Sequence, residues 1–244
     1  MNETITRVSP RLKARIAGFL YLITIVAGFF AFSTRSGLIV SGEAAATARN
    51  ILASESLYRS SIAADLIGIA SYVGVTALLY GLLRPVDRTV SLLAAFFSLM
   101  GCAMGIAITL DLVVPLVLLG DAPYLAAFRP DQLQALARIS LRLHGEGYSI
   151  SLIFFGFYCA LLGWLAFRST FLPRFVGVLL VVAGLGWLSD SLANLVWPAL
   201  GDRLDSYAMI TGGLGEGGLC LWLLAVGVNT ARWEKQAGSE GLTR

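Results

Sequence analysis

Long apolar segments alternate with short polar ones along nearly the whole chain. Six of the apolar segments approach or exceed the roughly 20 residues that an α-helix needs to cross a hydrocarbon core about 30 Å thick. They cover about residues 16–32, 61–83, 89–119, 147–167, 175–199 and 207–228. The pattern predicts an all-α fold: a polytopic membrane bundle of six transmembrane helices that forms a single membrane domain over residues 1–244.

Short charged turns separate several of these segments. The sequence RPVDR, residues 84–88, joins the second span to the third, and RSTFLPR, residues 168–174, joins the fourth to the fifth. Proline and charge together favour a tight turn. The first span is longer than the core of a secretory signal, which is about 7–15 residues. We therefore expect an uncleaved transmembrane helix, with a signal peptide cleaved near Ala31 as the alternative.

Two polar segments carry apolar residues at helical spacing. In SGEAAATARNILASESLYRSS, residues 41–61, the spacing is set by Ala44, Ala48 and Ile51. In RPDQLQALARISLRLHGEG, residues 129–147, it is set by Leu133 and Leu136. This periodicity predicts two short amphipathic helices that lie on the outer surface. They would either cap the bundle or form a lid over an outer cavity.

Composition and charge agree with a membrane protein. The chain is 57% hydrophobic and 14% charged, against about 25% charged in an ordinary soluble domain, and its mean hydropathy is +0.78. The bilayer is the expected partner. If the N-terminus is inside, the inner segments hold eleven of the 18 Lys and Arg residues and the outer segments seven. This bias predicts cytoplasmic N- and C-termini in a cell (inner or plasma) membrane. The sequence shows no basic patch for nucleic acid and leaves the oligomeric state open.

The residue inventory argues against several kinds of centre. The three cysteines lie inside apolar spans without a C-x-x-C pair, so neither a disulfide framework nor a zinc site is expected. The two lysines, Lys13 and Lys235, lie outside the spans, which excludes a retinal Schiff base. His144 alone cannot build a histidine-rich metal centre. We expect no metal and no cofactor.

Five carboxylates fall within or at the edge of the predicted spans. Asp111, Asp190 and Glu216 lie eight or nine residues from the outer ends of their spans, or roughly 12–13 Å deep at the rise of an α-helix. Asp65 and Glu146 lie close to the outer ends. A charge at the bilayer centre costs about 2.5–3.5 kcal/mol on insertion scales, so these groups should face the bundle interior or water.

Neutral polar residues share faces with these acids. Trp187 and Asn194 lie on the face of Asp190, Tyr72 and Thr76 lie on that of Asp65, and His144 is next to Glu146. The pattern predicts a polar cavity, and its alternative is a set of structural hydrogen bonds between protonated acids and polar neighbours. The candidate binding residues are Asp111, Asp190, Glu216, Asp65, Glu146, His144, Asn194 and Tyr72; no catalytic residue is identified.

Glycines surround Glu216 in the segment MITGGLGEGGLCLW, residues 209–222. Gly213 and Gly217 form a G-x-x-x-G pair, which predicts close approach of a neighbouring helix. Alternatively, bare backbone leaves room for water or a ligand beside the acid. Gly101 and Gly105 form another such pair in the third span, and we expect close packing there.

Two stretches resemble the DUF4386 family of uncharacterised multi-span membrane proteins. They are SGLIVSGEAAATARNILASESLYRSSIAADL, residues 36–66, and YGLLRPVDRTVSLLAAFF, residues 80–97. The similarity covers nearly the whole chain, and residues 36–59 are its most specific part. It implies six spans and a bacterial inner membrane protein, but no substrate, cofactor or catalytic residue.

Three functions remain open at this stage. Acids at a common depth and a faint internal repeat favour a carrier or binding protein for a small solute or protons. A non-catalytic partner or scaffold protein is the main alternative. A lipid-acting intramembrane enzyme, with paired carboxylates as acid and base, is disfavoured because no nucleophile motif or metal-ligand set is recognised.

Overall fold

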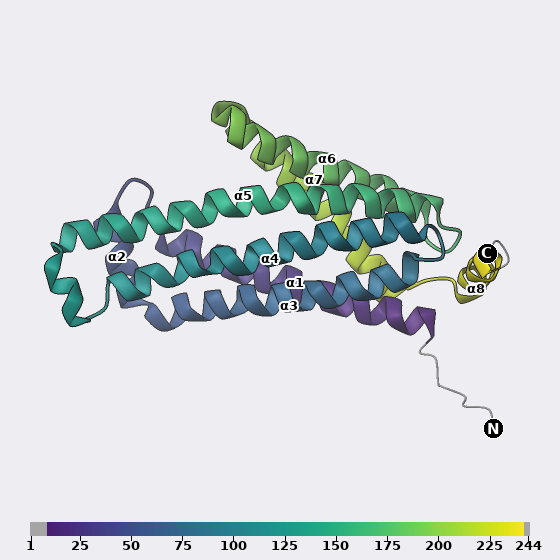
Figure 1. Ribbon diagram of the computed structural model, residues 1–244, viewed down its shortest axis with the longest axis horizontal. Helices are drawn as coiled ribbons and strands as arrows, with labels where there is room; N and C mark the ends of the chain where they lie inside the picture. Colours follow the sequence, from purple (N-terminus) through teal and green to yellow (C-terminus); the bar gives the residue numbers. More distant parts are fainter. Residues whose placement is uncertain (1–8, 242–244) are drawn as a thin grey trace, which may run out of the picture.

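The computed structural model describes residues 9–241, and over this range it contains eight α-helices, one 3-10 helix and no strand (Figure 1). The helices are α1 (Pro10–Leu38), α2 (Ala44–Ala53), α3 (Glu55–Leu83), α4 (Arg88–Leu118), η1 (Pro123–Ala127), α5 (Pro130–Arg168), α6 (Arg174–Val196), α7 (Pro198–Ala225) and α8 (Thr230–Gly241). Six of them, α1 and α3 to α7, are long and apolar enough to cross a membrane. The predicted helical membrane bundle is confirmed.

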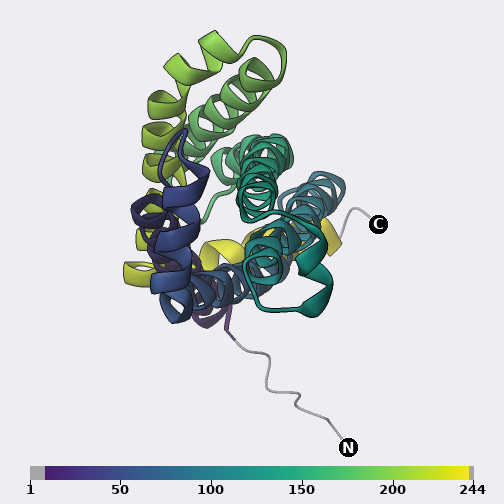
Figure 2. The same ribbon diagram turned by 90° about the vertical axis from the view of Figure 1, so that its left-hand side faces the viewer.

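The six long helices form a closed ring. Each packs against the next in chain order, and α7 packs against α1 to complete the circle. Figure 1 shows the tight turns and α8 at one end of the ring, here called the α8 end, and α2 and η1 at the other, the α2 end. Figure 2 looks onto the α2 end, where the turn between α6 and α7 stands away from the other helices.

Local sequence signals explain where several helices begin. The Ser9 side chain accepts a hydrogen bond from the Leu12 amide, and Pro10 occupies the first turn of α1. The Asp87 side chain accepts from the Val90 amide at 2.9 Å and starts α4 directly after the tight turn. Trp197 interrupts the helical backbone between α6 and α7, and Pro198 opens α7. Each signal satisfies or removes a backbone donor that a helix start leaves unpaired.

The predicted outer helices have different outcomes. The first is present as α2, which buries Thr47, Ala48 and Ile51. The second is helical but continues without a break into the fourth span, so that α5 is one helix of 39 residues. Gly147 lies where α5 packs closely on α4, because a Cβ atom there would lie 2.6 Å from the Ile108 side chain.

The bounds of other helices also differ from the sequence prediction. Helix α1 runs past the predicted end of the first span to Leu38, and α3 begins at Glu55 instead of residue 61. Helix α7 begins at Pro198, nine residues before the predicted start of the sixth span. Helix α8 was not predicted. Polar residues extend these helices because caps and packing, which a hydropathy pattern does not contain, determine where a helix ends.

Two hydrophobic clusters close the ring at different levels. The larger cluster fills the half of the bundle toward the α8 end, where Leu79, Leu82, Leu165, Leu180 and Leu223 are almost completely buried. The smaller cluster lies at the α2 end and joins helices α1 to α5; its buried members are Leu38, Ile51, Tyr58, Ile62, Leu112 and Leu141. Helices α6 and α7 contribute no residue to the smaller cluster. The bundle therefore has space between the two clusters.

Candidate functional site

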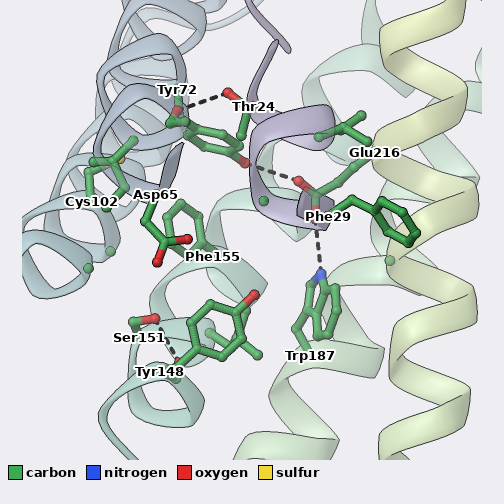
Figure 3. Close-up of a pocket in the computed structure, with 18 of the residues that line it drawn as sticks. Thr24, Phe29, Asp65, Tyr72, Cys102, Tyr148, Ser151, Phe155, Trp187 and Glu216 are labelled. Carbon is green, nitrogen blue, oxygen red and sulfur yellow. Dashed lines mark hydrogen bonds between the residues drawn. The ribbon is translucent and has the colours of Figure 1, made fainter. Parts of the chain in front are cut away.

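A cavity of about 400 Å³ occupies this space. All six long helices contribute to its wall, which is mostly apolar and aromatic (Figure 3). The residues with a polar, charged or thiol side chain that line it are Thr24, Arg35, Asp65, Tyr72, Cys102, Thr109, His144, Tyr148, Ser151, Trp187 and Glu216. Their positions along the helices divide them into a floor near the middle of the bundle and a rim toward the α2 end.

Glu216 forms the floor of the cavity together with three aromatic hydrogen-bond donors. The Tyr21 hydroxyl donates to Glu216 Oε2 at 2.6 Å, and the Tyr72 hydroxyl lies 3.2 Å from the same oxygen. The indole Nε1 of Trp187 donates to Oε1 at 3.1 Å, as Figure 3 shows. These donors come from α1, α3 and α6, while the acid comes from α7. The carboxyl group therefore joins four helices of the ring.

The glycines of α7 explain how Trp187 reaches Glu216. Gly212 lies directly against the indole ring of Trp187, and a Cβ atom at Gly215 would be 2.7 Å from the Ala183 side chain of α6. These two glycines bring α7 close to α6. Gly213 and Gly217 differ from the predicted close-packing pair, because both line the cavity and a Cβ atom on either would meet nothing within 4 Å.

The predicted close packing at Gly101 and Gly105 is present in α4. A Cβ atom at Gly101 would lie 2.7 Å from the Phe155 ring, and one at Gly105 would lie 3.2 Å from the Ile69 side chain. Both glycines also line the cavity. Here the absence of side chains lets α5 and α3 approach α4 and places Phe155 in the cavity wall.

An ion pair lies at the rim. Arg35 Nη1 of α1 contacts Asp65 Oδ2 of α3 at 2.6 Å, and their side chains are only 14% and 18% exposed. The hydropathy pattern predicted an outer loop at Arg35. The extension of α1 to Leu38 instead places it within the last turn of the helix. The positive charge of Arg35 therefore neutralises Asp65. The hydropathy pattern did not predict this contact.

His144 and Glu146 are separated by the structure. His144 lines the cavity, and its Nδ1 lies 3.0 Å from the backbone oxygen of Ile108. Glu146 is exposed and pairs with Arg142 of its own helix at 3.5 Å. Residues two apart on an α-helix point to opposite sides. The structure therefore does not place Glu146 at the cavity.

Asp111, Asp190 and Asn194 do not line the cavity either. Asp190 is 4% exposed and accepts a hydrogen bond from Asn194 Nδ2 at 3.0 Å, next to the start of α7, where Gly201 packs against Asn194. Asp111 is partly buried on α4, off the face that carries Gly105 and Ile108. Asp111, Asp190 and Glu216 were predicted at equal depth, but only Glu216 lines the cavity. Of the eight candidates, the residues that line it are Asp65, Tyr72, His144 and Glu216.

The sequence pattern did not predict Tyr21, Arg35, Tyr148 or Phe155 as site residues. Tyr21 gave a detectable signal, since it places a hydroxyl in the middle of an otherwise apolar span. Trp187 was considered only as a neighbour of Asp190. Phe155 gave no signal at all, because an aromatic residue in a span is ordinary. Its position in the wall depends on Gly101 of another helix.

The fold and cavity define a polytopic helical membrane protein with a carboxylate-based pocket inside its ring. The chain belongs to the family described as Domain of unknown function (DUF4386), which it matches over residues 16–227. The resemblance stated from the sequence is therefore confirmed. An uncharacterized protein of Archaeoglobus fulgidus is 27% identical to the chain over 158 residues, which are 64% of this chain and 76% of that protein. No solved structure matches the chain.

Proposed function

We propose that the protein is a carrier that binds a small solute in the central cavity and couples this binding to the protonation of Glu216. The observation that supports this most directly is the floor of the cavity. There, Glu216 accepts hydrogen bonds from three neutral donors, and no Lys, Arg or His within residues 9–241 forms an ion pair with it. A carboxylate without a cation inside a membrane bundle is a functional-site hypothesis by default.

The hydrogen-bonding groups around Glu216 can accept either protonation state. When the acid is ionised, both tyrosine hydroxyls and the indole donate to it. When it carries a proton on Oε2, that proton can be donated to a tyrosine hydroxyl, since hydroxyls both donate and accept. The Tyr21 and Tyr72 hydroxyls lie 3.4 Å apart, so one can then donate to the other. Gain or loss of the proton requires only rotation of hydroxyl groups.

The two clusters favour access from one side. The large hydrophobic cluster closes the α8 end below Glu216, whereas the α2-side half of the bundle contains the cavity. With the predicted topology, the α8 end faces the cytoplasm and the cavity faces outward. Arg7 and Arg244, which contribute to that topology prediction, lie outside the described residues. A carrier would open the α8 end in a second state, as alternating access requires.

The experiment that tests this proposal measures the proton current across proteoliposome membranes, read as the change in lumenal pH with an enclosed dye, because exchange of one monovalent cation for one proton moves no net charge. The solutes are added at a fixed pH in four classes: organic amines, quaternary ammonium compounds, carboxylic acids and zwitterionic amino acids. We expect currents for at least one class with the parent protein and none for that class with Glu216→Gln. Asp190→Asn is the matched control, because it also neutralises a span carboxylate but one outside the cavity; it should keep the current.

The proposal is overturned if no class gives a current that depends on Glu216. In that case the non-catalytic partner or scaffold role predicted as the alternative becomes the better explanation. The lipid-acting enzyme gains no specific support from the site, where the floor contains one carboxyl group instead of a pair.

A further inference from the structure

We infer that the ligand of this cavity is a monovalent organic cation with an apolar body, and that it enters from the bilayer between α1 and α7. The inference rests on the proposed function, because it names the class of solute that the same site would take. Three features of the cavity lead to it: its charge, its aromatic wall and the side on which it opens.

The charges along the cavity leave one negative site. Arg35 and Asp65 at the rim neutralise each other at 2.6 Å. Glu216 at the floor has only neutral donors around it. With His144, which also lines the cavity, in its neutral form, an ionised Glu216 therefore gives the cavity one uncompensated negative charge, which a monovalent cation would balance. A neutral ligand would leave this charge unpaired in a poorly hydrated site, and an anion would meet repulsion there.

Aromatic rings stand beside that charge. Trp187 and Tyr72 both line the cavity and both hydrogen-bond Glu216, so their rings lie next to the carboxylate. The Phe155 ring packs edge-on against Tyr72 with centroids 5.1 Å apart and also lines the wall. Aromatic faces attract cations, and quaternary ammonium groups in particular are bound in aromatic surroundings. The floor thus combines a carboxylate with rings that suit an alkylated cation.

The wall between floor and rim suits an apolar body. Asp65 at the rim and Tyr72 at the floor are seven residues apart on α3, or about 10 Å at the helical rise. Ile69, Phe155 and Leu152 line the cavity between them or across from them. The volume of about 400 Å³ falls within the range of roughly 300–1,000 Å³ that small-molecule sites usually have. A ligand with a cationic end and an apolar remainder fills this space.

The side on which the cavity opens lies between α1 and α7. Close contacts between these helices occur toward the α8 end: Cys220 Sγ lies 3.4 Å from the Gly18 backbone oxygen, and Tyr21 bonds Glu216. Beyond Glu216, residues of both helices line the cavity and are also exposed. Phe29 of α1 is 72% exposed and Met209 of α7 is 50% exposed. These side chains lie on the lateral surface of the ring, at the level of the membrane-spanning segments.

Glycines widen this opening. Gly28 of α1 and Gly213 of α7 line the cavity, and a Cβ atom at either position would meet nothing within 4 Å. Because these two glycines do not pack against a neighbouring helix, they leave an opening between α1 and α7, here called the window. A solute that partitions into the bilayer can reach Glu216 through this window without passing the ion pair at the rim.

The test uses two probes of the same shape and opposite charge, tetraphenylphosphonium and tetraphenylborate. Their binding to the purified protein in nanodiscs is measured by equilibrium dialysis, with empty nanodiscs subtracted. We expect saturable binding of tetraphenylphosphonium that weakens by roughly tenfold or more in Glu216→Gln. In the parent it should weaken in acid, where a proton on Glu216 removes the negative charge and a proton on His144 adds a positive one. Tetraphenylborate should not bind saturably. Asp190→Asn should bind tetraphenylphosphonium like the parent.

Failure of this inference differs from failure of the proposed function. If carboxylic acids or zwitterions give Glu216-dependent currents while tetraphenylphosphonium does not bind, the carrier stands and the ligand class is wrong. If tetraphenylphosphonium and tetraphenylborate bind equally well, or if binding is indifferent to Glu216→Gln, the charge argument is overturned. Absence of any Glu216-dependent current or binding overturns both.

The route is tested separately by closing the window. Gly213→Leu places a side chain in the opening, while Gly37→Leu adds the same side chain to open space on α1 at a position that does not line the cavity. We expect Gly213→Leu to slow association of tetraphenylphosphonium by roughly tenfold and Gly37→Leu to leave the rate unchanged. Equal rates in all three proteins would show that the ligand does not enter between α1 and α7.

Discussion

At the scale of single residues, the unusual feature is a carboxyl group that binds four helices together and also faces a cavity. Glu216 receives hydrogen bonds from Tyr21, Tyr72 and Trp187, each on a different helix. On the sequence alone, a structural network and a functional cavity are alternatives. The structure shows that the same carboxyl group takes part in both. The two roles are separable by substitutions that keep or remove the hydrogen-bond acceptor.

Glu216→Gln and Glu216→Ala should have different effects on stability. Glutamine keeps the size and one acceptor oxygen, and its amide can donate to a tyrosine hydroxyl. Alanine leaves three donors without an acceptor, at about 1–3 kcal/mol for each group left unsatisfied. We expect a small decrease in melting temperature for Glu216→Gln in detergent and a large one for Glu216→Ala.

The same measurement across pH tests ionisation. The difference in melting temperature between the parent and Glu216→Gln should change with pH, since only the parent can ionise at this position. A constant difference from acid to alkaline pH would show that Glu216 keeps one protonation state in the folded protein. Equal melting temperatures for Glu216→Gln and Glu216→Ala would show that the three hydrogen bonds contribute little to stability.

Tyr21→Phe tests the shortest of these hydrogen bonds. A hydrogen bond to a charged group contributes roughly 1.5–3 kcal/mol, so the variant should be destabilised by that order. It should also alter the pH dependence of ligand binding. Tyr58→Phe is the matched control, because its buried hydroxyl donates to the Leu112 backbone oxygen at 2.8 Å outside the cavity. Tyr58→Phe should lose stability without changing the pH dependence of ligand binding. If both variants change this pH dependence equally, the change results from a general loss of packing and not from the hydrogen bond to Glu216.

At the scale of elements, the two sides of α7 differ in packing. One side carries Gly212 and Gly215 and packs tightly on α6, while Gly213 and Gly217 leave space toward the cavity. A glycine motif in the sequence does not distinguish these cases. Both have the same residue type at helical spacing, and only the position of a neighbouring helix determines which glycines are in contact.

Alanine substitutions on α7 should therefore have opposite signs. Gly217→Ala adds a methyl group to open space and removes backbone freedom from the unfolded chain, so we expect stabilisation by about 0.5–1 kcal/mol. Gly215→Ala forces a Cβ atom to within 2.8 Å of the Leu179 backbone oxygen, and overpacking of this kind costs about 1–3 kcal/mol. Thermal unfolding in detergent measures both. Gly81→Ala on α3, where a Cβ atom also meets no neighbour, measures the effect of helix propensity alone. If Gly217→Ala is less stable than Gly81→Ala, relative to the parent, the space beside Gly217 is not open.

The ion pair between α1 and α3 should contribute more than the other pairs of the described chain. Removal of one partner from a fully buried pair costs roughly 3–5 kcal/mol, and Arg35–Asp65, with partial exposure, should fall below that range. Arg35→Ala and Asp65→Ala should each lower the melting temperature. The double exchange Arg35→Asp with Asp65→Arg should recover part of the loss. Arg142→Ala is the control, since exposed pairs contribute about 0–1 kcal/mol; an equal effect there would contradict the importance of burial.

At the scale of the whole molecule, the closed ring accounts for the cavity. Neighbouring helices pack side by side, and the larger cluster fills the ring only toward the α8 end. The α6–α7 hairpin stays outside the smaller cluster at the α2 end, and its turn stands apart from the other helices in both ribbon views. The half of the molecule toward the α8 end is therefore packed throughout, while the half toward the α2 end contains the cavity, which is the asymmetry that a carrier with one accessible side would show.

The predicted orientation can be tested with single added cysteines. The native Cys102, Cys159 and Cys220 are buried, but Cys102 lines the cavity, so labelling of the parent by a membrane-impermeant maleimide gives the background. Ser41→Cys lies in an exposed loop at the α2 end, and Glu234→Cys lies on the exposed surface of α8. In intact cells we expect labelling of Ser41→Cys alone, with Glu234→Cys labelled only after the membrane is permeabilised. The reverse result would invert the topology and make the cavity face the cytoplasm.

The sequence determined the class of this protein. Apolar segments of about 20 residues match the length at which an α-helix crosses a bilayer with its backbone polar groups paired, so six membrane-crossing helices followed from hydropathy. The residue Glu216 also stood out from the sequence alone, because an acid in the middle of an apolar segment requires a partner or water. Hydropathy could not predict helix ends such as that of α1, because they depend on caps and packing.

Only the tertiary structure decided which of the polar residues meet. Periodicity places Asp111, Asp190 and Glu216 at similar depth, but it says nothing of how each helix is rotated about its own axis in the ring. That rotation results from contacts between residues far apart in the chain, such as Gly215 against Ala183 and Gly101 against Phe155. These contacts turned Glu216 toward Tyr21, Tyr72 and Trp187, and left Asp190 with Asn194 outside the cavity.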